Sequence, residues 1–494
     1  MSELLYGYHK IDPTTWAYLS SLLMIGLYFK FSRFWSVRNL DLILLILLAP
    51  GLLLVHRGQE LRQAAPLMKE VEQATPAPES SAPPVTETGN SLTSLLSADA
   101  AAGDPMTDVL GLREPEAPPD QTLAQKTTEA GIRSERWGYL LLFISGGLLL
   151  VRLLADPTMV RRPLLEPNLS PGGLTFIGCS LFVFLLANVI ASRPTEGTQW
   201  PRNAPGYVLI QGLPEIPTVR VSELPPTAEP VGGVEINAAL AKTLVVLAHL
   251  AIVLAVVGIG WRHFDNTKMG VGAATLYMMM PYTAQMTGSA YHAIPGALLL
   301  WAVLCYRRPL TAGIFMGIAI SVCYYPIYLL PLWLSFYWQR GLMRFISGAS
   351  LGILAMALVL LFRVDNAADY AYELRRMFGA LPFRMQDLGG IWSLGWDPWY
   401  RVPMLAAFVV LAGSFALWPA QKNLGTLLSC SAAVMLAAQF WHGDGGGLYM
   451  AWYLPLLLLT IFRPNLEDRV ALSVLGEGWF PRRRYAPSTF ERAA

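Results

Sequence analysis

Long apolar runs separated by short polar stretches dominate the sequence. About twelve of these runs approach or exceed the 17 to 25 residues that a helix needs to cross a bilayer. The pattern predicts an all-α polytopic membrane protein with about twelve spans. The runs lie at 14–30, 40–55, 137–154, 174–191, 238–261, 270–286, 290–305, 311–337, 345–362, 402–418, 424–440 and 448–462.

The run at 311–337 is longer than one crossing needs and contains Pro326. As a single helix it would place Arg340 and Arg344 outside. As a hairpin that turns near Tyr325 it would return to its starting side and keep both arginines in the cytoplasm, where basic residues accumulate. We favour the hairpin, although it leaves five arginines outside in the loop 363–401: Arg363, Arg375, Arg376, Arg384 and Arg401.

Basic residues between the other runs set the predicted orientation. Cytoplasmic loops carry an excess of Lys and Arg, and the basic turns alternate correctly if the N-terminus is outside and the C-terminus is cytoplasmic. These basic residues follow the first, third, fifth and seventh runs: Lys30, Arg33, Arg38, Arg152, Arg161, Arg162, Arg262, Lys268, Arg307 and Arg308.

Two polar regions interrupt the apolar pattern. Residues 57–136 are rich in Pro, Ala, Glu and Ser and predict a disordered external loop. Residues 192–236 are rich in proline, with short strands predicted at 207–210 and 217–221. The predicted organisation begins with two spans in 1–56, the disordered external loop 57–136, two more spans in 137–191 and the proline-rich external loop 192–236. A membrane core at 237–462, which includes an interfacial loop at 363–401, and a basic tail at 463–494 follow.

Composition agrees with a membrane location and excludes several other classes. The 494 residues are 54% hydrophobic and 14% charged, and the mean hydropathy is +0.42, more apolar than an ordinary soluble domain. We find no basic patch for nucleic acid. The four cysteines lie in or beside apolar runs without CxxC spacing, so neither a disulfide framework nor a zinc site is indicated.

The segment 288–326 is the most specific part of the sequence. It predicts one apolar helix, a turn with two arginines, and a second apolar helix that a proline ends. Small residues in a membrane helix allow a neighbouring helix to pack closely. The second helix carries such residues at Gly313, Gly317 and Ala319.

The block 261–345 resembles the GT-C class of integral membrane glycosyltransferases, especially the bacterial mannosyltransferase-like type that uses a polyprenol-phosphate sugar. That class follows a short basic turn with spaced small residues and prolines. This chain matches the pattern at Ala312, Gly313, Gly317, Ala319, Pro326, Leu330 and Pro331. Tyr449 to Pro455 resembles the closing helix of such enzymes. The resemblance covers about the last half of the chain.

The resemblance implies a GT-C-like core in the inner membrane of a cell. It implies transfer of a sugar from a polyprenyl-phosphate donor to an acceptor on the outer face, with no cofactor besides that donor; the role of a divalent metal is left open. A carboxylate must accept the proton of the acceptor hydroxyl, and cations must hold the lipid phosphate. The candidates are Glu60, Asp365 and Asp444 as the base and Arg375, Arg376 and Arg384 as the phosphate ligands.

Two polar corners are further candidates for substrate binding. Phe440 to Gly447 holds His442 and Asp444 beside glycines that permit close approach to a ligand. Tyr291 and His292 begin the run after Gly288. A buried histidine there is a functional candidate, whereas one at the interface is only an anchor, and both interpretations stay open. Two ligands are too few for a metal site.

The alternative is a non-catalytic membrane scaffold or assembly subunit. Cys323 occupies the position where the GT-C pattern often has lysine, and the first external loop holds no acidic residue in a recognisable motif. A long disordered external arm would suit capture of a membrane protein partner. The lipid bilayer is the partner that both hypotheses require.

Overall fold

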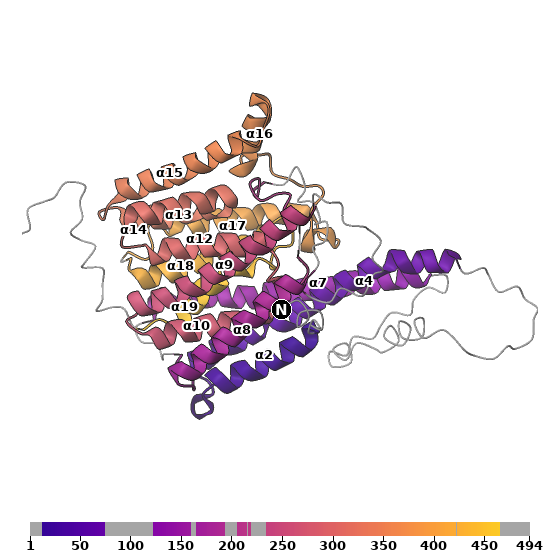
Figure 1. Ribbon diagram of the computed structural model, residues 1–494, viewed down its shortest axis with the longest axis horizontal. Coiled ribbons are helices and arrows are strands. Elements are labelled where there is room, and N and C mark those ends of the chain that lie inside the picture. Colours follow the sequence, from indigo (N-terminus) through magenta and orange to yellow (C-terminus); the bar gives the residue numbers. More distant parts are fainter. Residues whose placement is uncertain are drawn as a thin grey trace, which may run out of the picture. The chain divides into compact units, whose positions relative to one another are not determined.

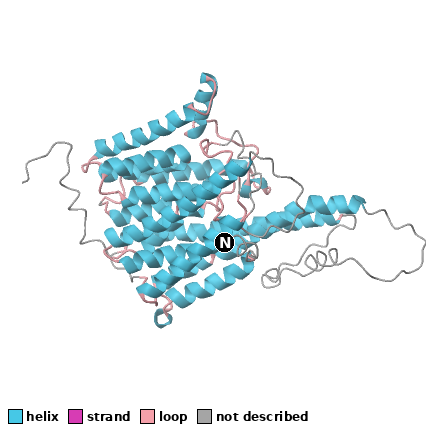
Figure 2. Cartoon of the chain, in the orientation of Figure 1, coloured by secondary structure: helices cyan, strands magenta, loops and turns pink. Residues whose placement is uncertain are grey.

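The computed structural model describes residues 12–74, 122–159, 165–192, 205–214, 216–218, 234–420 and 422–464. No β-strand occurs among these residues, so the predicted helical class is confirmed for them (Figure 2). The described part supports a multi-pass membrane protein but not the predicted count of twelve spans. Six helical segments in it are long and apolar enough to cross a membrane: Val37–Pro66, Leu123–Thr158, Pro171–Ala191, Asn237–Arg262, Leu342–Leu361 and Leu424–Trp441.

The helices follow the predicted apolar runs. The α-helices are α2 (Pro13–Tyr28), α3 (Val37–Ile46), α4 (Leu48–Ala74), α7 (Leu123–Ala155), α8 (Pro171–Ala191), α9 (Val234–Arg262), α10 (Thr267–Met279), α11 (Pro281–Met286), α12 (Ala290–Leu304), α13 (Pro309–Val322), α14 (Leu330–Tyr337), α15 (Leu342–Leu361), α16 (Ala367–Met377), α17 (Arg401–Ser414), α18 (Leu424–Trp441) and α19 (Leu454–Phe462). Short 3-10 helices are η1 (Phe31–Arg33), η2 (Asp156–Thr158), η3 (Tyr325–Leu329), η4 (Gly390–Ser393), η5 (Pro398–Tyr400) and η6 (Met450–Trp452).

The chain forms two compact units, Met1–Leu52 with Tyr139–Ala494, and Leu53–Gly138. In the first unit, α12 packs against α9 and α13, and α10 packs against α8, α9 and α19 (Figure 1). The second unit consists, in its described part, of the end of α4 and the start of α7.

Hydrogen bonds between loops define two ends of the first unit. At the basic end, the Tyr337 hydroxyl donates to the Tyr306 carbonyl over 2.7 Å, and Arg340 donates to the Lys422 carbonyl over 3.1 Å. At the aromatic end, the Trp452 indole donates to the Tyr291 carbonyl over 3.3 Å. We use "basic end" for the loops 29–36, 262–267, 305–308, 338–341 and 415–423 without residue 421, and "aromatic end" for the loops 205–214, 216–218, 280–290, 378–400 and 442–449.

The chain reverses between α13 and α14, along the path that the sequence analysis favoured over a single crossing. At the aromatic end, the Val322 carbonyl accepts from the Tyr207 amide over 3.0 Å. The next residues form η3, and α14 then returns to the basic end, where Tyr337 reaches Tyr306. Pro326 lies at the start of η3. Proline is tolerated there, because a backbone N–H at the start of a helix has no acceptor within the helix.

The predicted close packing of the small-residue helix is also formed. A Cβ atom added to Gly313 or Gly317 of α13 would overlap main-chain oxygens of Phe345 and Ala349 in α15. Glycine is therefore required for the observed approach of these two helices, since any side chain would push the backbones apart.

The prediction that residues 57–136 are disordered is wrong at both edges. Helix α4 runs to Ala74, and α7 begins at Leu123. Ala, Glu, Gln, Arg and Leu near these edges are strong helix formers and extend the apolar helices, whereas the proline-rich centre dominated the composition. Residues 75–121 lie outside the described residues.

Contacts inside the second unit pair its two helices. Arg62 and Glu135 form an ion pair of 2.9 Å, and a Cβ atom on Gly131 would lie 2.9 Å from the Gly58 carbonyl oxygen. The two helices are thus in close contact at a pair of glycines.

The strand predicted at 207–210 is also wrong. This segment forms turns, with positive φ angles of 87° at Gly206 and 57° at Tyr207. Its amides bond to the ends of helices: Gly206 donates to the Arg376 carbonyl over 2.9 Å. Tyr207, Val208 and Ile210 are buried, although no strand occurs among the described residues to pair with this segment. Pro217 and Thr218 are irregular, and 219–221 lie outside the described residues, as do 1–11 and 465–494.

Candidate functional site

The aromatic end brings the two predicted polar corners together. The ring of Tyr449 lies between the imidazoles of His292 and His442, with 4.5 Å between ring centroids on each side. Both histidines are buried, and Tyr291 is partly buried. Residues separated by 150 positions in the sequence therefore form one cluster, as the hypothesis of a shared site requires.

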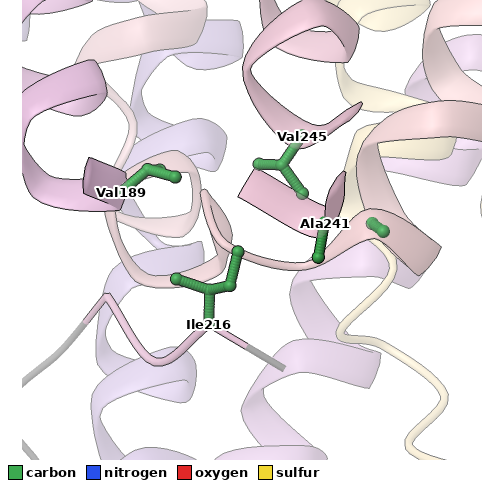
Figure 3. Close-up of a cluster of buried hydrophobic side chains, with 5 residues drawn as sticks. Val189, Ile216, Ala241 and Val245 are labelled. Carbon is green, nitrogen blue, oxygen red and sulfur yellow. The ribbon is translucent and has the colours of Figure 1, made fainter. Parts of the chain in front are cut away.

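A small apolar cluster supports the start of α12 beside this site. Val189 of α8, Ala241 and Val245 of α9, and Ile216 pack together with Ala290 (Figure 3). A Cβ atom on the neighbouring Gly288 would overlap the main chain of Ile216. The chain can therefore turn into α12 at this point only with glycine.

His292 is held by a tyrosine that the sequence analysis did not select. The hydroxyl of Tyr282 lies 2.7 Å from Nδ1 of His292 and accepts a hydrogen bond from the Ala451 amide over 3.1 Å. With that amide as its donor, the Tyr282 hydroxyl can donate its own proton to Nδ1. This bond favours the interpretation of His292 as a buried functional candidate over that of an interfacial anchor.

The glycine loop at 443–447 is shaped by left-handed glycines and by one buried glutamine. Gly445 and Gly447 have φ angles of 70° and 97°, which favour glycine. Oε1 of Gln439 accepts from the amides of Gly447 and Tyr449, over 3.1 and 3.3 Å. Gln439 was not among the predicted site residues, although a polar residue near the end of an apolar run can indicate a functional position.

Asp444 of this glycine loop forms an ion pair with Arg384 of the loop 378–400. Their side chains are 17% and 14% exposed, so the pair is largely removed from water. Burial raises the pKa of Asp444, although Arg384 and Arg401 oppose the shift. Nη1 of Arg384 is buried and makes no hydrogen bond with the described residues. The guanidinium thus has one donor group left for a ligand oxygen.

His442 is neutral in this setting. Burial lowers its pKa well below the usual range, and the nearby charge of Arg401 adds to the effect. Its Nδ1 accepts from the Asp444 amide over 3.0 Å, which fixes the ring relative to the carboxylate.

Arg401 fastens the loop that carries Arg384 to the end of α18. Its Nε donates to the Trp441 carbonyl over 3.1 Å, its Nη1 donates to the Arg384 carbonyl, and its guanidinium lies 4.5 Å from the centre of the Phe383 ring. The sequence alone indicated no role for Arg401 beyond its charge in the external loop.

Further contacts join the loop 378–400 to the glycine loop. The Trp392 indole donates to the His442 carbonyl over 2.9 Å, and the Gly389 amide donates to the Gly443 carbonyl over 2.8 Å. Trp392 itself is buried. Tyr325 of η3 stacks on His442 with 4.9 Å between centroids. These tight contacts make the corner a fixed arrangement.

Several predicted site residues lie elsewhere. Arg375 is exposed on α16, whereas Arg376 is buried and pairs with Glu373 at 3.2 Å. Asp365 is exposed before the start of α16. Glu60 belongs to the second unit, where its Oε1 lies 3.1 Å from Nε2 of His56. Of the three predicted carboxylates, Asp444 is the one that contacts a predicted phosphate ligand.

Among the described residues, no group of three His, Cys, Asp or Glu side chains is close enough to hold a metal ion. No protein-family model, curated protein or solved structure matches this chain.

Proposed function

We propose that the protein is an integral membrane glycosyltransferase that moves a sugar from a polyprenyl-phosphate donor to an acceptor. The reaction takes place at the aromatic end, which faces outward from the inner membrane, with the N-terminus outside and the C-terminus cytoplasmic. The shorter helices such as α12 and α13 lie between the same two ends as the longer ones, so we infer about twelve spans in addition to the hairpin of α13 and α14.

The Arg384–Asp444 pair is the observation that carries this proposal. A lipid phosphate at a membrane surface needs a cation with a free donor, and guanidinium groups bind phosphate in two-pronged geometry. Arg384 has a buried nitrogen without a partner among the described residues. Asp444 also belongs to a glycine loop, in which Gly445 and Gly447 adopt positive φ angles.

The proposed reaction needs one proton transfer and one exchange of bonds at the sugar. The acceptor hydroxyl oxygen attacks the anomeric carbon, the bond between that carbon and the phosphate oxygen breaks, and polyprenyl phosphate leaves with the electron pair. Asp444 accepts the hydroxyl proton, a role that its raised pKa favours. Arg384 then turns from Asp444 to the phosphate, whose negative charge increases as it leaves.

The histidines and Tyr291 line the sugar side of this proposed site. In both histidines Nδ1 already accepts a hydrogen bond within the protein, so each neutral ring carries its proton on Nε2 and would act as a donor to a sugar hydroxyl. His442 lies next to Asp444 through the bond to its amide, so a hydroxyl bound by His442 would be close to the carboxylate. Arg375 and Arg376 remain predictions as phosphate ligands, as do Glu60 and Asp365 as bases; nothing in their surroundings favours them over Arg384 and Asp444.

The test is transfer of labelled sugar from a polyprenyl-phosphate donor in membranes that contain the protein. We expect Asp444→Asn to lower the rate by about 10²–10⁴-fold, the usual contribution of a general base. Asp387→Asn is the matched control, since Asp387 is exposed on the loop that carries Arg384 and its positive φ of 51° suits asparagine. Normal transfer by a folded Asp444→Asn protein would eliminate this assignment.

Cys323 supports one alternative function, a non-catalytic scaffold or assembly subunit. Its thiol is buried and lies 3.5 Å from the Tyr207 hydroxyl, at the position where the GT-C pattern often has a lysine. Copurification with a stable membrane protein partner, together with absence of donor-lipid binding, would favour this alternative.

A further inference from the structure

The loop between α2 and α3 presents aromatic and basic side chains outward. Trp35 is 92% exposed, Phe31 is 74% exposed and Phe34 is 50% exposed. Lys30 and Arg33 are also exposed. Large exposed aromatic side chains in a cluster usually mark an interaction surface. We refer to Phe29–Ser36 as the Trp35 loop.

Asn39 gives the Trp35 loop a fixed shape. Its side chain is fully buried, and its Nδ2 donates to the carbonyls of Lys30, Arg33 and Phe34 over 2.9, 3.0 and 3.2 Å. Its Oδ1 accepts from the Lys30 amide over 3.2 Å. These bonds fix the loop backbone, so binding through its outward side chains requires no further ordering of the main chain.

Phe29 forms the base of the aromatic cluster. It is buried, and its ring centroid lies 5.0 Å from that of Phe31 and 5.4 Å from that of Phe34. Phe34 in turn contacts Trp35 at 5.4 Å. The exposed rings therefore belong to one packed group that continues into the protein.

The exposed face of α3 continues from this loop towards the bilayer interior. The candidate membrane span begins at Val37. Leu40, Ile43 and Leu47 are exposed apolar residues with helical spacing, which is the pattern of a lipid-facing stripe. At about 1.5 Å per residue, Leu47 lies ~10 Å deeper than Leu40. The Trp35 loop thus lies at the level where the hydrocarbon ends.

Charge near the loop favours an anionic partner. No Asp or Glu occurs between Asp12 and Asp41. The basic residue Arg38 is directed inward, with hydrogen bonds of 2.9 Å to the Tyr28 carbonyl and 2.7 Å to the Glu166 carbonyl. The Glu166 carboxylate is the single acidic side chain of the adjacent segment 165–170. The two positive charges of Lys30 and Arg33 therefore outnumber the one negative charge nearby, that of Glu166.

We propose that the Trp35 loop is an interfacial anchor that binds anionic phospholipid headgroups. Trp35, Phe31 and Phe34 lie among the headgroups, where amphipathic aromatic rings are favoured. Lys30 and Arg33 contact the lipid phosphates, and each basic residue near an anionic surface contributes about 1 kcal/mol, or about fivefold in affinity. This inference does not depend on the proposed enzymatic activity.

Brominated lipids test the proposal, because bromine quenches tryptophan fluorescence at contact. The protein is reconstituted in bilayers with brominated phosphatidylglycerol or brominated phosphatidylcholine. The signal of Trp35 is the difference between the wild type and Trp35→Phe. We expect that signal to be quenched by both lipids, and at lower mole fractions by the anionic one. Lys30→Gln with Arg33→Gln should reduce this preference by up to about 25-fold.

Two further variants separate charge from general effects. Arg307→Gln with Arg308→Gln removes two exposed cations from another loop of the basic end and should leave the Trp35 preference unchanged. Arg33→Lys keeps the charge and should keep most of the preference. Equal quenching by the two lipids in the wild type would overturn the assignment of an anionic headgroup. Absence of any Trp35 quenching would overturn the anchor itself and indicate a protein partner.

Discussion

Gly352→Ala is predicted to destabilise the protein at the contact between α13 and α15. Gly352 is buried, and an added Cβ atom would lie 2.6 Å from the Ile314 carbonyl oxygen and 3.1 Å from the Ile318 amide nitrogen. Ordinary contacts of a Cβ atom lie at 3.4–4 Å. The two helices must therefore separate locally by roughly 0.8 Å, a change that close-packed interiors resist.

The expected loss of stability depends on which atoms the added Cβ atom would contact. Overpacking of a dense interior usually costs about 1–3 kcal/mol, and the atoms here belong to the backbone, so no side chain can rotate away. Truncation of a neighbouring side chain should therefore not rescue the variant. A helix-propensity gain of up to about 1 kcal/mol for Gly→Ala offsets part of this cost.

Thermal unfolding in lipid nanodiscs is the assay. Gly413→Ala is the control, since a Cβ atom on Gly413 in α17 would meet nothing within 4 Å. It should keep or slightly raise the melting temperature, while Gly352→Ala lowers it. Equal melting temperatures for the two variants would show that the α13–α15 contact is looser than described.

Two other predictions concern buried charges. Arg152→Ala leaves the carboxylates of Asp41 and Asp156 without the guanidinium that lies 2.7 and 3.1 Å from them. The variant should lower the free energy of unfolding by about 3–5 kcal/mol, whereas the control Arg308→Ala on the surface should lower it by less than about 1 kcal/mol. Similar losses of stability for the two variants in thermal unfolding would refute the role of the network. The folded-state pKa of Asp444 is raised above 3.8, so its contribution to stability is fully present below the unfolded-state value and is lost as pH rises through the folded-state pKa. Asp444→Asn should remove that part of the pH dependence, and an unchanged loss of stability as pH rises above 3.8 would contradict the shift.

The apolar runs were sufficient to predict helices and the reversal after α13, because both depend on local properties. Run length sets a helix, and Pro326 with the distribution of arginines indicated the turn. The edges of the proline-rich region were mispredicted because composition averages over a window, whereas the helices that end at Ala74 and begin at Leu123 continue from apolar neighbours.

The candidate site was predictable only in part. His292, His442 and Asp444 are polar residues in apolar or glycine-rich surroundings, which is a local signal. The residues that hold these three side chains in place are distant from them in the sequence. Tyr282 contacts both His292 and Ala451, and Arg401 bonds to residues on two other segments. Such contacts depend on which faces of distant helices meet, and a single sequence does not encode that in any short pattern.

The charge network of Arg152 also has a consequence for biosynthesis. Asp156 contacts Arg152 within the same segment and, at 2.7 Å, Arg463 just after α19. A ribosome releases Asp156 some three hundred residues before Arg463. During that interval the inserted early helices hold a carboxylate whose second partner has not yet been synthesised. The ion pair between Asp156 and Arg463 can therefore form only after the last described helix has been synthesised.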